Sequence, residues 1–197
     1  MTSAWVSRAF AAALHVTAAV FSGLPSQPVA AGPLFSRTFG AAPAPVDAKL
    51  RDIHGRTWEF RRNALGGTAT LVSFTLVGCV KLCPVSDHYM NLVEDLLRSS
   101  GREARLVTLT INPDDRSEEL RRHVDQFAPG TNRVFLTGEI LELVPLLDSL
   151  GMPAGTTDDH PLFFLIFDRS GRMVRRISEA TASPELLLDA VLAADRP

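Results

Sequence analysis

The sequence predicts an α/β fold, specifically a three-layer sandwich with a mixed central sheet and an N-terminal β-hairpin. Apolar, β-branched runs of strand length alternate with segments whose apolar residues recur at helical spacing. The last two strand-like runs are joined by a tight turn at Arg169–Gly171, which indicates an antiparallel pair. The chain has 197 residues, a length that suits one domain with an appendage.

Residues 1–31 have the pattern of an export signal. Arg8 supplies a positive charge, Ala9–Phe21 is apolar, and the small residues Val29–Ala31 form a cleavage site. The apolar run is about 13 residues, whereas a bilayer span needs roughly 20. We therefore expect a signal peptide, with an uncleaved membrane anchor as the alternative. Either places the protein in the periplasm or on the outer face of the cytoplasmic membrane.

The elements that follow are expected in a regular order. Residues 32–46, rich in Gly, Ala and Pro, predict a linker before a folded domain at 47–197. Lys49–Phe60 predicts a hairpin that turns at His54–Gly55. Thr68–Val77 is rich in apolar and β-branched residues, has no charged residue, and is typical of a central strand buried on both faces.

From Pro84 onward the apolar spacing becomes helical. The predicted buried stripe of this helix consists of Val85, Tyr89, Leu92, Val93, Leu96 and Leu97, and Ser100–Gly101 ends it. The later elements are a strand at Arg105–Ile111, a helix with Leu120, Val124 and Phe127 inward, a strand at Arg133–Leu136, a helix at Glu139–Leu150 containing Pro145, strands at Leu162–Phe167 and Arg172–Ile177, and a helix from Ser183–Pro184.

Composition and charge narrow the function classes. Hydrophobic residues make up 46% of the chain, enough for a core that needs no disulfide staples. The formal net charge is −2, and the basic residues are spread along the chain. Because phosphate binding requires clustered positive charge, nucleic acid is excluded as a partner.

The segment Val77–Pro84 contains both cysteines of the chain, Cys79 and Cys83. It lies between the buried strand and the amphipathic helix, and Pro84 suits the first helical turn. Cys83 is therefore expected at a helix N-terminus, where free amides favour a thiolate, and Lys81 adds positive charge nearby. Two such thiolates can bind one soft metal ion or oxidise to a disulfide.

A purely structural disulfide is the plain alternative. So short a loop would gain roughly 2 kcal/mol from closure, against about 3 kcal/mol for a loop of fifteen residues. A domain with this much apolar core gains little from that, so a metal or redox role is favoured.

A metal site would need a third ligand, and the chain has five histidines. His15 lies in the signal segment, His54 in a hairpin turn, and His88 and His123 on helices where a surface position is expected. His160 differs because it ends a Gly-, Thr- and Asp-rich loop and precedes a strongly apolar strand. Loops at strand ends are where ligand groups gather in α/β sheets.

From about Leu65 onward, the chain resembles the Sco/SenC family of thioredoxin-like copper carriers, which serve assembly of the CuA centre of cytochrome c oxidase. The resemblance rests on Cys79-Val80-Lys81-Leu82-Cys83-Pro84, on Asp159-His160 before the strand Leu162–Phe167, and on Thr108–Asp115, which is similar to the family's S-I-D-P stretch with Asn112 in place of Asp. The first two motifs together are fairly specific to the family, whereas either one alone is a weak signal.

The resemblance implies a function and a site. Cys79 and Cys83 would be thiolate ligands as well as a redox pair, and His160 the imidazole ligand, oriented by Asp158 or Asp159. Two sulfurs and one nitrogen suit Cu(I), with Cu(II) as a second state, while a closed zinc site wants a fourth ligand. The implied partners are the oxidase subunit that carries CuA and a copper donor protein.

Three residues depart from the family pattern, and two of these departures favour a second function. Val80 replaces a proline, Lys81 stands where an acidic residue is common, and Pro161 follows the histidine, similar to the cis-proline of thioredoxins. Lys81 and a cis Pro161 would suit a thiol–disulfide oxidoreductase that reduces the cysteines of a partner metalloprotein. A peroxidase-type reductase is a more distant alternative.

Overall fold

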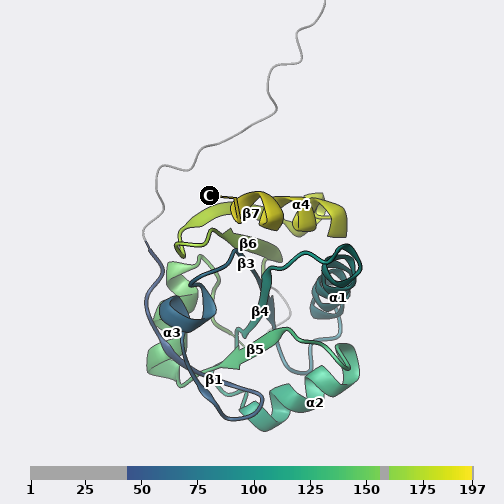
Figure 1. Ribbon diagram of the computed structural model, residues 1–197. Helices are drawn as coiled ribbons and strands as arrows, with labels where there is room; N and C mark the ends of the chain where they lie inside the picture. The colour runs from purple at the N-terminus through teal and green to yellow at the C-terminus, as the bar shows by residue number, and fades with distance from the viewer. Residues whose placement is uncertain (1–43, 156–159, 197) are drawn as a thin grey trace, which may run out of the picture. The chain divides into compact units, whose positions relative to one another are not determined.

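The computed structural model describes residues 44–155 and 160–196 (Figure 1). The signal segment at 1–31, nearly all of the linker at 32–46, and the acidic pair Asp158 and Asp159 lie outside the described residues. Within the described ranges, no helix combines the length and the apolar character needed to span a bilayer.

A mixed sheet of seven strands forms the centre of the domain, in the order β2-β1-β5-β4-β3-β6-β7. Strands β3, β4 and β5 run parallel to one another, whereas the β1–β2, β1–β5, β3–β6 and β6–β7 pairs are antiparallel. The strands are β1 (Lys49–Asp52), β2 (Thr57–Glu59), β3 (Thr70–Thr75), β4 (Arg105–Thr110), β5 (Val134–Thr137), β6 (Phe163–Phe167) and β7 (Met173–Ser178). The predicted N-terminal hairpin and mixed sheet are confirmed.

Helices cover both faces of this sheet (Figure 1). On one face, α1 (Cys83–Ser100) and α4 (Pro184–Ala194) bury Met90 and Val191 against Leu71 and Ile166. The helix α2 (Ser117–Phe127) packs on Phe135 of β5, and α3 (Ile140–Ser149) covers the opposite face. The three-layer arrangement predicted from the alternating pattern is therefore present. Two short helical turns, Phe60–Ala64 and Glu179–Thr181, were not predicted.

The buried face of α1 differs from the predicted stripe. Leu92, predicted to face inward, is 36% exposed, whereas Met90 and the polar Ser86 and Asp87 are buried. The helix begins at Cys83, which points into the core, and this start fixes the face that recurs at Met90, Val93 and Leu97. The sequence pattern was misread because two polar residues occupy inward positions.

Asp52 holds the turn of the N-terminal hairpin. Its carboxylate accepts hydrogen bonds from the backbone amides of His54 and Arg56, both at 2.9 Å, from Arg56 Nε at 2.6 Å and from Trp58 Nε1 at 3.1 Å. Burial alone would raise the pKa of Asp52, but these bonds outweigh burial and lower it. A lowered pKa means that the ionised carboxylate stabilises the fold.

We expect Asp52→Asn to lower the free energy of unfolding by about 1–3 kcal/mol at pH 7, because bonds to a charged acceptor are lost. The contribution is present above the ordinary Asp pKa of about 3.9 and is lost as the pH falls through the lower folded-state pKa. Urea unfolding of parent and variant at pH 7 and at pH 3 measures this difference. The exposed Asp125, changed in the same way, is the control and should shift little. An equal deficit at both pH values would contradict the prediction.

Candidate metal centre

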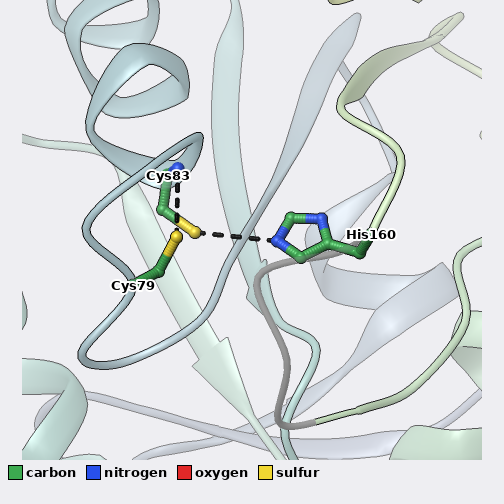
Figure 2. A group of neighbouring side chains, drawn as sticks. All are labelled: Cys79, Cys83 and His160. Atoms are coloured by element: carbon green, nitrogen blue, oxygen red, sulfur yellow. Dashed lines mark hydrogen bonds between the residues drawn. The ribbon is translucent and has the colours of Figure 1, made fainter.

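Cys79, Cys83 and His160 come together although 77 residues separate Cys83 from His160. One ligand atom from each residue lies within 4.8 Å of the others, the only such cluster found in the described part of the chain. Figure 2 shows the two sulfurs and the imidazole ring facing one another. His160 Nε2 is 3.8 Å from Cys83 Sγ. The convergence expected from the sequence is thus present. Because each donor would bond the ion at roughly 2.0–2.3 Å, two donors of one ion lie farther apart than that, and 3.8 Å between them is compatible with a shared ion.

All three side chains are buried. Cys79 is 1% exposed, Cys83 0% and His160 6%. The two cysteines belong to an apolar cluster that includes Leu76, Ile111 and Phe163. Both cysteines are free thiols in this structure. A buried pocket with soft donors and apolar walls suits an ion that must be kept from water.

The cysteines are presented by the segment that connects β3 to α1. A turn closes directly after β3, where the Cys79 amide donates to Leu76 O at 3.0 Å and Gly78 adopts a φ of 81°. A side chain at Gly78 would be strained in this left-handed conformation. The chain then bulges outward at Val80, which is 79% exposed, and returns at Leu82 to begin the helix.

The first backbone amide of α1, that of Cys83, interacts with the sulfur of Cys79. The backbone N–H of Cys83 donates to Cys79 Sγ at 3.4 Å, so the helix N-terminus contacts Cys79 and not the sulfur of Cys83. Burial raises the pKa of the Cys83 thiol above its ordinary value, and the hydrogen bond with Cys79 raises it further. The expected activation of Cys83 by the helix terminus is therefore wrong. Cys83 favours the neutral thiol until a cation compensates its charge.

Of the two features that the sequence offered for disulfide exchange, Lys81 and a cis Pro161, the structure contradicts the second. Lys81 lies in the exposed part of the loop. The described residues contain no cis peptide bond, so His160–Pro161 is trans and the predicted cis-proline is wrong. The carbonyl of Pro161 instead lies 3.4 Å from His160 Nδ1. With Nδ1 as the donor in this contact, the Nε2 lone pair is free to face the sulfurs.

The other described histidines do not join the site. His54 and His88 are exposed, as expected. His123, predicted to be solvated, is buried, and its Nε2 lies 2.8 Å from Asp87 Oδ2 and 3.1 Å from Thr75 Oγ1. Arg133 completes the cluster, with Nη2 3.1 Å from Asp87 Oδ1. The spacing could have revealed this, because position 123 shares the inward face of α2 with Leu120 and Val124.

A hollow of about 390 Å³ lies next to Cys79 and is lined by Cys79, Val80, Glu119, Arg122, His123 and Phe127, among others. A larger hollow of about 520 Å³, lined by Arg98, Arg102 and Arg105, lies near the C-terminal end of α1 and contains none of the three site residues. Of these two hollows, the smaller one is lined in part by a residue of the site, Cys79.

Comparisons with known proteins bear on the family and the fold of this chain. The family model described as SCO1/SenC matches residues 48–194. No curated protein matches the chain. Yeast Sco1 with copper bound matches at 20% identity and a TM-score of 0.66, covering 76% of this chain and 87% of that one.

Two further structures are similar. Copper-bound ScoI of Arabidopsis thaliana matches at 19% identity and a TM-score of 0.66, covering 77% and 97% of the two chains. BsSco, described as having a disulfide switch and as a member of the Sco family of cytochrome c oxidase assembly proteins, matches at 17% identity and a TM-score of 0.67, covering 80% and 96%. The predicted thioredoxin-like fold is confirmed. With the family model spanning nearly the whole described domain, the chain belongs to the SCO1/SenC family.

Proposed function

We propose that this protein binds one Cu(I) ion through Cys79 Sγ, Cys83 Sγ and His160 Nε2. The observation that carries the proposal is the convergence of these three buried donors within 4.8 Å. Two thiolates and an imidazole form the soft, three-coordinate set that Cu(I) prefers. Copper is bound in the similar structures of yeast Sco1 and Arabidopsis ScoI, which supports the same cargo here.

Membership of the SCO1/SenC family supports a proposal for where the copper is delivered. We propose that the protein is exported by residues 1–31, extends its domain at 47–197 into the periplasm or along the outer face of the membrane, and supplies copper for the CuA centre of cytochrome c oxidase. A copper donor protein would load it. The description of BsSco as an oxidase assembly protein supports this role.

Thiol–disulfide exchange is the second candidate, supported by the free cysteine pair and by the disulfide switch ascribed to BsSco. Three observations weigh against it as the main activity. Both sulfurs are buried, the pKa of Cys83 is raised, and the His160–Pro161 bond is trans. Exchange requires an exposed thiolate, whereas copper binding benefits from enclosure.

Anaerobic titration of the reduced protein with Cu(I), in competition with a chromophoric chelator, tests the proposal. We expect one ion per chain and an affinity that rises with pH, because binding displaces thiol protons and the Cys83 proton is held more tightly than usual. Each displaced proton contributes up to about tenfold per pH unit. The contribution of Cys83 continues until the pH passes the pKa of its thiol, which burial raises above the ordinary value of about 8.5.

Oxidised protein with a Cys79–Cys83 disulfide is the control and should not compete for Cu(I). Failure of the reduced protein to take up copper, combined with rapid turnover of a disulfide substrate, would replace this proposal with the second candidate.

A further inference from the structure

Asp115 lies where the ends of three parallel strands meet the cysteine loop. It follows β4 and is buried. Its Oδ2 accepts hydrogen bonds from Thr110 Oγ1 at the end of β4 and from the backbone amide of Val77, the latter at 3.1 Å. Its Oδ1 accepts from Asn112 Nδ2 at 2.9 Å. The hydroxyl of Thr137, at the end of β5, donates to the Asp115 carbonyl.

The bond to Val77 matters because of where Val77 lies in the chain. Val77 is the second residue of the turn Leu76–Cys79, which places Cys79 after the end of β3. Among the described residues, Asp115 is the one side chain from outside the segment 77–82 that hydrogen-bonds to the backbone of this segment. Beyond Val77 the loop bulges into solvent at Val80, so the bond to Asp115 is the last hydrogen bond before Cys79 that joins the loop backbone to a side chain outside the loop.

Ionisation of Asp115 is unfavourable at this buried position. Burial raises the pKa of Asp115, and only the hydrogen bonds from Thr110, Val77 and Asn112 oppose that effect. A buried carboxylate with three donors specifies one backbone geometry more strictly than an apolar side chain would.

We propose that Asp115 is a positioning residue for the copper site, which holds the Val77 amide and thereby fixes Cys79 Sγ relative to Cys83 Sγ and His160 Nε2. This inference rests on the proposed function, since copper affinity is one of its readouts. It gives the loop after β4 a role in setting the relative positions of the two sulfurs, which follow the neighbouring strand β3.

The variants Asp115→Leu and Asp115→Asn separate the hydrogen bond from mere filling of space. Leucine has a similar size and accepts no bond, while the asparagine oxygen can still accept from Val77. We expect Asp115→Leu to weaken Cu(I) binding by about 10- to 100-fold, the range typical of lost outer supports of a metal site. Asp115→Asn should stay within about threefold of the parent on the same scale.

Thr137→Val is the matched control. It removes a buried hydrogen bond to the same residue but leaves all three bonds to the carboxylate in place. It should lower thermal stability and leave copper affinity unchanged. If Thr137→Val weakened copper binding as much as Asp115→Leu, the effect would be one of general stability and the inference would be overturned.

Two measurements without copper keep the inference separate from the proposed function. In the reduced full-length protein, iodoacetamide should alkylate Cys79 several-fold faster in Asp115→Leu than in the parent, with Cys83 changed less. The second measurement uses the parent protein alone and so does not depend on the folding of a variant. In it, the Val77 amide should exchange with deuterium far more slowly than the amide of the exposed residue Val80. Equal exchange at the two amides, or unchanged alkylation in a folded Asp115→Leu, would overturn the role of Asp115. A parent that binds no Cu(I) would instead overturn the proposed function.

Discussion

Replacing Cys79 or Cys83 by serine is expected to reduce Cu(I) affinity by about 100-fold or more. Binding free energies at protein thiolate sites are on the order of 10 kcal/mol. If three ligands share this energy, loss of one costs about 3 kcal/mol, and each 1.4 kcal/mol corresponds to a factor of about ten. A serine hydroxyl is a hard donor that does not replace a thiolate for Cu(I). The same chelator competition measures the loss.

Val80→Ser is the matched control for the cysteine variants. It introduces the same side chain into the same loop at a position that is 79% exposed. We expect parental affinity for this variant. A single cysteine variant that still bound Cu(I) as tightly as the parent would rule out a site built on both sulfurs.

His160→Ala is expected to weaken Cu(I) binding by about 10- to 100-fold or more, since even lost outer-shell partners have effects of that size. Both sulfurs remain, so the Cys79–Cys83 pair should still be oxidised and reduced by a glutathione buffer. Chelator competition and thiol quantification measure the two properties. This separation distinguishes a ligand role for His160 from a general role in folding.

The exposed His88 on α1 provides the control. His88→Ala should match the parent in both measurements. Unchanged copper affinity in His160→Ala would show that the imidazole, although 3.8 Å from Cys83 Sγ, is not a ligand.

Much of the fold was predictable because its elements have uniform patterns. The strand β6 is apolar throughout and β3 is buried throughout, and Gly101 ends α1 in a left-handed conformation with a φ of 62°. The predicted boundaries agree with the structure to within a few residues. Prediction failed in α1, where Ser86 and Asp87 are buried. The partners of Asp87 are His123 of α2 and Arg133, which directly precedes β5, and such distant contacts leave no local trace in the sequence.

The three site residues could be predicted from the sequence, but the residues that support them could not. Cys79, Cys83 and His160 carry distinctive chemistry at recognisable spacing, whereas their supports are ordinary residues. Asp115 was read only as part of a motif, and its bond to Val77 depends on the neighbouring positions of β3 and β4. The pKa of Cys83 was predicted in the wrong direction because burial, which sequence does not give, outweighs the nearby helix terminus.

The buried group formed by Asp87, His123 and Arg133 bears on how this protein can change over evolutionary time. Asp87 lies one turn after Cys83, and both its carboxylate oxygens are engaged by groups from other elements. Loss of one member leaves a charge or a donor stranded in the core, whereas joint replacement by apolar residues can be close to neutral. These three positions should therefore mutate together or not at all. After a joint replacement, the helix that carries Cys83 keeps its rotation only if the new apolar residues pack equally well.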